Sequence, residues 1–245
     1  MIDQQPGHPH DPFAHRRGEP RTFIALWVAL LLASIAITLG GVGMLGLLAT
    51  DVYRPAARRL LVIIMVACVV LWPMLRLSQT PPRRPARAFL VDALAILVPL
   101  QAIVWPQSLP WMAAWPVEVS ACIALWFVGC ALVVAGGLAW FFAGERPVCP
   151  PWAMMTLFVA VALAGVIACA VRPAAELDGD PQRSLDVWMM ASPVTGVWEV
   201  TEDRGWSGDA ARVSAGHWWA VGAVFLLAAG AWGACLVRRG RRGGA

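Results

Sequence analysis

Asp92 is the acidic residue that lies deepest inside an apolar segment of this 245-residue chain. An ionised carboxylate at membrane depth is costly, so it needs either a partner or a function. It lies about one and a half helical turns into its segment, which is close enough for an arginine near the segment's end to reach it. The arginines so placed are Arg76, Arg84 and Arg87. Two interpretations follow, a structural ion pair and a proton or substrate site.

The same segment contains a proline and an amide. Pro99 removes one backbone hydrogen bond near the middle of the segment and predicts a kink there. Gln101 follows two residues later and can bond to the freed carbonyls. A kink beside a buried amide can mark a transport path. We therefore treat Asp92, Pro99 and Gln101 as a candidate intramembrane polar site.

The glycines Gly41, Gly43 and Gly46 have the GxGxxG spacing of a dinucleotide-binding turn. That fingerprint requires a strand that turns into a helix, whereas these glycines continue an apolar segment. Small residues inside membrane helices let neighbouring helices approach closely. We therefore expect close packing at these glycines. The same expectation applies to small residues of other segments: Ala36, Gly40, Gly129, Gly136, Gly137, Ala229 and Gly233.

The chain lacks the motifs of hydrolytic or metal-dependent chemistry, which needs a nucleophile paired with a base or a metal at fixed depth. No apolar segment contains an interior histidine, and the six cysteines form no CxxC pair. Scattered cysteines of this kind behave as small buried apolar residues. The sequence thus predicts no enzymatic activity, no metal and no cofactor. An integral enzyme that uses Asp92 is the least favoured alternative.

These residues belong to a chain dominated by apolar segments. Apolar residues make up 59% of the sequence, charged residues 14%, and the mean hydropathy is +0.66. Most of the segments approach the roughly 20 residues that a hydrocarbon core requires. The composition predicts an all-α, polytopic membrane helix bundle with six transmembrane helices. The predicted spans are Phe23–Leu48, Leu60–Leu75, Ala88–Trp105, Val119–Phe142, Pro151–Val171 and His217–Val237.

The predicted domains follow from these spans. Residues 1–21 form a disordered tail, residues 22–238 the six-span domain, and residues 239–245 a basic tail. The longest connection, residues 172–216, is too short to build its own core. It contains eight acids, including Glu199, and we expect a solvated loop. Leu185, Trp188 and Met189 share one helical face and predict a short helix on the membrane surface.

Arginine placement predicts the orientation, because short arginine-rich loops stay in the cytoplasm. All 19 basic residues are arginine, and with both termini inside, 12 lie on the cytoplasmic side and 7 on the outer side. Both termini are therefore expected in the cytoplasm. The exception is the first outer loop, which contains Arg54, Arg58 and Arg59. The absence of lysine and asparagine is typical of bacterial genes rich in G and C, which predicts a bacterial inner membrane protein.

Tryptophan collects on the predicted outer face. An aromatic belt at headgroup level explains such a set, because indole combines an apolar ring with a polar N–H. A tryptophan-lined platform for an amphipathic ligand or a partner is the alternative. The candidate residues for such an interaction are Trp188, Trp198, His217, Trp218 and Trp219.

The last fifth of the chain carries a family resemblance. Residues 191–198 read Ala-Ser-Pro-Val-Thr-Gly-Val-Trp, and residues 216–219 read Gly-His-Trp-Trp before a segment of small residues that Arg238 and Arg239 close. This ending resembles the last segment of bacterial ABC-type export permeases. The resemblance implies a subunit without catalytic residues that pairs with another permease and is driven by a separate ATPase. In place of that family's coupling helix and long second loop, this chain has a tail rich in proline and histidine and the short stretch Gln79–Arg87.

The leading hypothesis is a non-enzymatic integral membrane subunit, the permease part or a partner of a transport complex of the ABC export type. Its expected partners are the lipid bilayer, other membrane subunits and a cytoplasmic ATPase, with no nucleic acid. The alternative is an assembly or scaffold subunit of a membrane redox complex, in which the tryptophan-rich outer surface and the acidic loop bind a partner.

Overall fold

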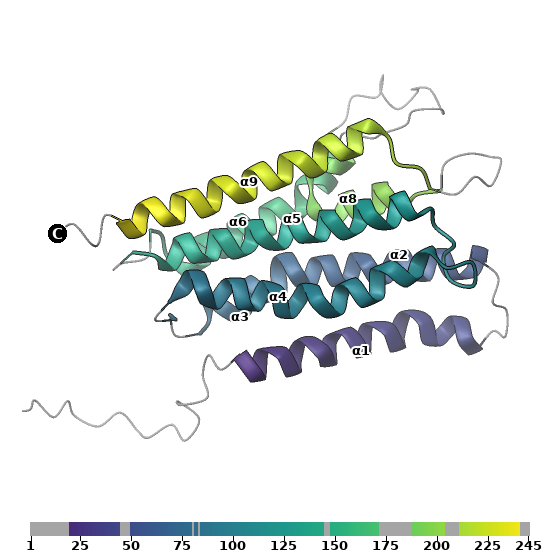
Figure 1. The fold of residues 1–245 in the computed structure, drawn as a ribbon, viewed down its shortest axis with the longest axis horizontal. Helices are drawn as coiled ribbons and strands as arrows, with labels where there is room; N and C mark the ends of the chain where they lie inside the picture. The colour runs from purple at the N-terminus through teal and green to yellow at the C-terminus, as the bar shows by residue number, and fades with distance from the viewer. Residues whose placement is uncertain are drawn as a thin grey trace, which may run out of the picture.

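The computed structural model describes residues 20–44, 50–79, 81–82, 84–144, 148–171, 188–203 and 211–240. The regular structure of these residues is helical, without strands, and the long helices lie roughly side by side in an elongated bundle (Figure 1). The α-helices are α1 (Pro20–Met44), α2 (Thr50–Val66), α3 (Trp72–Leu77), α4 (Pro85–Val104), α5 (Val117–Phe142), α6 (Pro151–Ala170), α8 (Pro193–Thr201) and α9 (Ala215–Gly240). The π-helical turn η2 (Ala67–Leu71) and the 3-10 turns η3 (Trp105–Ser108) and η4 (Met189–Ala191) complete the set.

Five segments of the described chain are long and apolar enough to cross a membrane, as in a multi-pass membrane protein. A helix suits this environment because it satisfies its backbone polar groups internally. The first predicted span falls in α1, where the apolar stretch Phe23–Thr38 is shorter. The other predicted spans fall within the five segments or within a few residues of their ends. These segments are Val52–Leu77, Pro85–Ser108, Val117–Phe142, Pro151–Ala168 and Ala215–Arg238.

The segment Val52–Leu77 joins α2 and α3 through the π turn η2. Pro73 follows this turn, has no N–H to donate and would crowd the carbonyl of Val69 in a regular α-helix. The wider turn avoids this conflict, and the N–H of Trp72 bonds to the carbonyl of Ala67 instead. A proline thus explains why the helix widens here, at the level where Val69 lines an apolar cavity that opens to the surface.

Helix α5 forms the centre of the bundle and packs most extensively against α9 and α4. Glycines make the contact with α9 possible, because a Cβ on Gly129 would lie 2.8 Å from Cγ1 of Val224 and one on Gly136 would lie 3.0 Å from Cβ of Ala231. Close packing at these two glycines is confirmed.

At the other small residues the expectation of close packing has mixed outcomes. A Cβ on Gly137 would lie 3.4 Å from Cε of Met154, which is an ordinary contact distance. At Gly40 and Gly233 the expectation is wrong within this chain, since nothing described lies within 4 Å of an added Cβ. Ala36 and Ala229 are likewise exposed. Gly46 and the surroundings of Gly41 and Gly43 lie outside the described residues.

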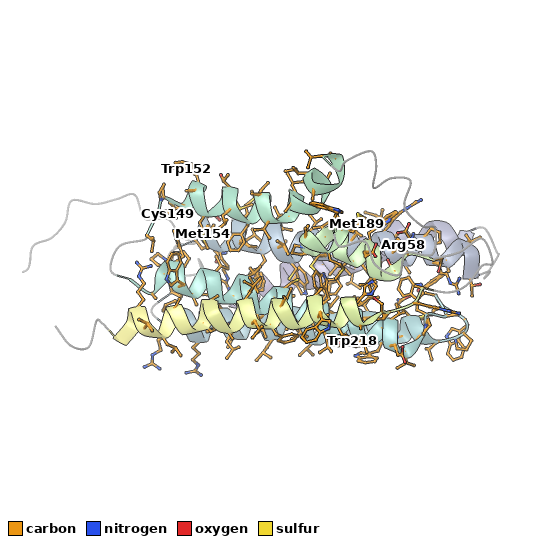
Figure 2. The ribbon with its side chains drawn as sticks, turned by 90° about the horizontal axis from the view of Figure 1, so that it is seen from above. Arg58, Cys149, Trp152, Met154, Met189 and Trp218 are labelled. Atoms are coloured by element: carbon orange, nitrogen blue, oxygen red, sulfur yellow. The ribbon has the colours of Figure 1, made fainter. Side chains whose placement is uncertain are left out.

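Helix α1 begins and α9 ends at the same end of the bundle (Figure 1), which we call the terminal end. We call the opposite end, where α1 ends and α9 begins, the distal end. Cys149, Trp152 and Met154 lie toward the terminal end, and Arg58 and Trp218 lie toward the distal end (Figure 2). Of the predicted tails, residues 1–19 and 241–245 lie outside the described residues, and α9 extends to Gly240.

Helix α8 is an element that the sequence analysis did not predict. The predicted surface helix around Leu185, Trp188 and Met189 falls largely outside the described residues, which resume with Trp188 in a turn and η4 at residues 189–191. Helix α8 lies at residues 193–201 and packs against α2, α5 and α6. Six of its nine residues are buried, so it lies inside the bundle.

The start of α8 lies near the middle of the bundle. Its N-cap residue Ser192 accepts a hydrogen bond from the N–H of Val194 and donates one of 2.6 Å to the carbonyl of Ala162, the twelfth of the 20 residues of α6. Nε1 of Trp126 donates to the carbonyl of Pro193 at 3.0 Å. The chain leaves α6 at the distal end and starts α9 there, so α8 is a re-entrant helix that returns from mid-depth to the distal end.

Candidate functional site

The Asp92 carboxylate forms an ion pair with Arg76 at the terminal end. Nε and Nη2 of Arg76 donate to the two carboxylate oxygens at 2.6 and 2.5 Å. Asp92 is 2% exposed, and the guanidinium also donates to Oε1 of Gln79 at 2.7 Å and lies 4.9 Å from the ring centre of Phe23. Both carboxylate oxygens accept from one arginine, so this geometry favours a structural ion pair over a proton or substrate site.

Gln101 and Pro99 do not join Asp92 in one site. Gln101 lies nine residues further along α4, about 13 Å away along the axis, and its Oε1 accepts a hydrogen bond of 2.9 Å from Nε1 of Trp105. Its amide nitrogen is buried without a hydrogen-bond partner in the described chain. The predicted polar site therefore separates into an ion pair at the terminal end and an amide in the distal half of α4.

A second buried polar cluster lies between α8 and α9, and we call it the Glu–His cluster (Glu199, Ser214 and His217). Glu199 and His217 are 1% and 0% exposed, and Nε2 of His217 lies 3.8 Å from Oε1 of Glu199. The other ring nitrogen, Nδ1, accepts the backbone N–H of Ser214 at 3.0 Å and lies 2.9 Å from its hydroxyl. His217 was expected on an outer surface, and this expectation is wrong because its side chain is buried.

The contact between Ser214 and His217 has the geometry of a helix cap. Ser214 immediately precedes α9, and His217 reaches back to its N–H as the third-position Glu or Gln does in a capping box. The proton of the neutral imidazole then lies on Nε2, which points toward Glu199. A serine beside a histidine and an acid also suits nucleophilic catalysis, but 3.8 Å is too long for the hydrogen bond that would orient the base. The cluster therefore caps α9 and joins it to α8.

Two arginines hold the distal end of α8. Nη2 of Arg58 donates to the carbonyl of Thr201, the last residue of α8, at 2.5 Å. Its guanidinium lies 4.9 Å from the ring centre of Trp198 and 3.9 Å from the carboxylate of Asp203. Arg54 approaches the same carboxylate at 3.6 Å and donates to the carbonyl of Ala113 at 2.8 Å. A cation suits this position, because the C-terminus of a helix carries partial negative charge.

An apolar cavity of about 570 Å³ lies between α5, α6 and α9, on the terminal side of the re-entrant turn. Helix α6 packs mainly on α8, η4 and η2, which leaves space between α6 and the pair formed by α5 and α9. Cys130 and Gly137 of α5, Phe158 of α6 and Ala223 of α9 are among its lining residues. Met190, Ala191, Ser192 and Pro193 line it where α8 begins.

Comparison with protein-family models, curated proteins and solved structures gives no match to this chain. The functional interpretation therefore rests on the geometry. The described residues contain no group of three or more His, Cys, Asp or Glu side chains that could hold a metal ion. Four of the five candidate outer-face residues, Trp188, Trp198, Trp218 and Trp219, are 37 to 80% exposed.

The sequence interpretation missed Glu199 and the re-entrant helix. Glu199 was counted among the acids of a solvated loop, whereas its side chain is buried. One signal was present: Ser192 followed by Pro193 is a good N-cap with proline at the first helical position. Acidic flanking residues and a length of nine residues hid this short helix from a search for membrane spans.

Proposed function

We propose that this chain is a six-span subunit of the bacterial inner membrane, with both termini in the cytoplasm, that forms the permease part of an export complex. The observation that carries the proposal is the re-entrant helix α8, which starts at mid-depth beside the apolar cavity. A permease needs a barrier between the two sides of the membrane and a space beside it. Helix α8 would supply the barrier, and the cavity the space.

The roles of the buried polar groups support a non-enzymatic subunit. Asp92 is paired with Arg76, and the Glu–His cluster caps α9. Neither group presents a nucleophile with an oriented base. Energy for transport would then come from a separate subunit, which agrees with the resemblance to ABC-type export permeases at the end of the chain.

The arrangement of arginines supports the proposed orientation. Arg54 and Arg58, two of the three exceptions to the positive-inside rule, are engaged with α8 and its flanking residues. Contacts with α8 and its flanking residues, and not only the membrane topology, therefore account for the positions of Arg54 and Arg58. The terminal end, which α9 approaches with Arg238, would then face the cytoplasm and the ATPase.

Cross-linking from the terminal end tests this proposal. Cys149 lies there and is partly exposed (Figure 2). A maleimide–benzophenone reagent on Cys149 of the full chain, irradiated in native membranes, should join it to a cytoplasmic nucleotide-binding subunit identified by mass spectrometry. The Cys149→Ser variant controls for other thiols. Recovery of haem or quinone proteins in place of an ATPase would contradict the proposal.

The exposed tryptophans of the distal end favour a second candidate, an assembly or scaffold subunit of a membrane redox complex. Trp219 is 80% exposed and Trp218 40% exposed at the start of α9. Such rings suit a protein partner as well as lipid headgroups. Replacing Trp219 with Ala should weaken co-purification with a redox partner if this candidate holds, and should leave ATPase cross-linking intact.

A further inference from the structure

We propose that the Glu–His cluster is a proton-binding site, and that a proton on Nδ1 of His217 releases the cap of α9. The ligand is a proton that enters from the distal side of the membrane. This inference concerns how the distal ends of α8 and α9 respond to acid, and it does not depend on export.

The neutral imidazole faces a carboxylate without bonding to it. The N–H of Ser214 donates to Nδ1 of His217 at 3.0 Å, so the proton of the neutral ring lies on Nε2. Nε2 is buried and has no hydrogen-bond partner among the described residues. Oε1 of Glu199 is 3.8 Å away, which is too long for a hydrogen bond. A buried donor without an acceptor is costly, so the neutral cluster leaves one polar group unsatisfied.

A second proton changes the contacts on both sides of the ring. It binds at Nδ1 and ends the bond from the N–H of Ser214, because both nitrogens are then donors. The new N–H can donate to Oγ of Ser214 instead, which lies 2.9 Å from Nδ1. The ring also becomes a cation beside Glu199, and an opposite charge within about 4–6 Å favours the charged form. One proton therefore exchanges the cap of α9 for an ion pair with α8.

The cluster lies close to the distal surface although Glu199 and His217 are buried. Glu202 is exposed and follows Glu199 by three residues, about 4.5 Å of helical rise. Ser214 is only partly buried. A proton thus reaches the pair through a local opening of the last turn of α8, without passage through the bundle.

The other charged groups at this end leave room for a further positive charge. Helix α6 and η4 contain no acidic, basic or histidine residue. Arg54 and Arg58 of α2 would oppose a cation, but both approach the carboxylate of Asp203, which offsets them. The ionisable residues with described side chains on α2 near this end, at the start of α5 and beside α8 and α9 are Tyr53, Arg54, Arg58, Arg59, Glu118, Glu202, Asp203 and Arg212.

Nitrogen NMR of His217 tests the site directly. The full chain, with histidine labelled at both ring nitrogens, is reconstituted in phospholipid nanodiscs. The His8→Gln/His10→Gln/His15→Gln background leaves His217 as the single histidine. Nδ1 should be unprotonated at about pH 8 and should gain a proton between about pH 8 and about pH 5, the range in which imidazoles titrate. A proton on Nδ1 at the alkaline end, or a ring that stays neutral throughout, overturns the proposal.

Hydrogen exchange connects this proton to the cap. Protection of the Ser214 amide, corrected for the intrinsic pH dependence of exchange, should fall about tenfold between about pH 8 and about pH 5, the change that a loss of 1.4 kcal/mol gives. Protection that stays constant in acid overturns the proposal.

A matched pair of variants identifies the acid that holds the proton in place. Glu199→Gln keeps the shape of the side chain and removes its charge, so His217 should bind the proton about tenfold more weakly. Glu202→Gln removes an exposed acid three residues away and should bind the proton as the wild type does. Equal proton affinity in the two variants refutes the pairing of Glu199 with His217.

Discussion

Arg76 donates hydrogen bonds from two of its nitrogens to Asp92, one to each carboxylate oxygen. The pair connects α3 to α4, and Phe23 of α1 covers the guanidinium. Three helices therefore meet at one buried ion pair near the terminal end. An arginine holds a carboxylate in this way more rigidly than a lysine could, because its planar fork matches both oxygens.

Removing one partner of this pair should destabilise the bundle strongly. Asp92→Leu leaves the Arg76 charge buried without its partner, which costs about 3–5 kcal/mol. The double variant Arg76→Met/Asp92→Leu removes both charges and should recover most of that loss. Denaturant titration in detergent micelles measures the free energy of unfolding of each form. A double variant no more stable than Asp92→Leu would show that the pair has a different role.

Gly165 permits the close approach of α6 and α8. A Cβ at this position would overlap Oγ1 of Thr195 and lie 3.0 Å from Cβ of Ser192. Gly165→Ala should therefore displace the start of α8 and lower the free energy of unfolding by about 1–3 kcal/mol. Gly222→Ala on α9 is the control, because an added Cβ there meets nothing within 4 Å. Thermal melting in detergent compares the two, and equal melting temperatures would contradict the packing of α8.

Arg58 should hold the C-terminal end of α8 in place. Arg58→Gln removes the guanidinium from the carbonyl of Thr201 and from Asp203, a loss of about 1.5–3 kcal/mol for a charged hydrogen bond. Hydrogen exchange of residues 197–201 should then become faster. Arg59→Gln is the neighbouring control, since Arg59 is exposed. If both variants exchange α8 amides at the wild-type rate, Arg58 does not anchor the helix.

The extent to which the sequence predicted this fold depends on how strongly each segment signals its environment. Long apolar segments such as residues 119–142 and 217–237 have one stable solution in lipid, so their helices were predicted within a few residues. Arg76 was among three candidate partners of Asp92, because helical rise limits which arginines can reach. The choice among them required tertiary packing.

The re-entrant helix was not predictable by the same reasoning. Its nine residues are too few to span a membrane. In the sequence Glu199 looks like a solvated acid, because only the packing of α9 places His217 beside it. The exposure of Gly40 and Gly233 likewise depends on which face of a helix has a neighbour. Composition and spacing specify which residues can pack closely, whereas the contacts between distant segments decide which of them do.

The role of the Glu–His cluster as the cap of α9 can be tested by the stability of variants at His217 and Glu199. His217→Glu would restore the usual capping-box residue but would bring a second acid close to buried Glu199. We expect this variant to be destabilised by like-charge repulsion. The double variant Glu199→Gln/His217→Glu keeps the cap without the repulsion and should regain stability, measured by thermal melting. If the double variant melts no higher than His217→Glu alone, the histidine does more than cap the helix.

Cys149 provides a native reporter of orientation. It is partly exposed at the terminal end, whereas Cys68, Cys122, Cys130 and Cys235 are buried. With the terminal end in the cytoplasm, a membrane-impermeant maleimide should label it in inside-out vesicles and leave it unlabelled in right-side-out vesicles. Cys149→Ser measures background from the remaining thiols.

The distal end supplies the opposite reporter. In the Cys149→Ser background, Trp111→Cys replaces a side chain that is 64% exposed near the start of α5. This thiol should react from outside in right-side-out vesicles, because α4 and α5 each cross the bilayer once and their connection lies opposite Cys149. Labelling of both reporters from the same side would mean that α5 does not cross the membrane. Labelling of each from the side opposite to the one expected would invert the topology, and the arginine-rich carboxyl end would then lie outside the cell.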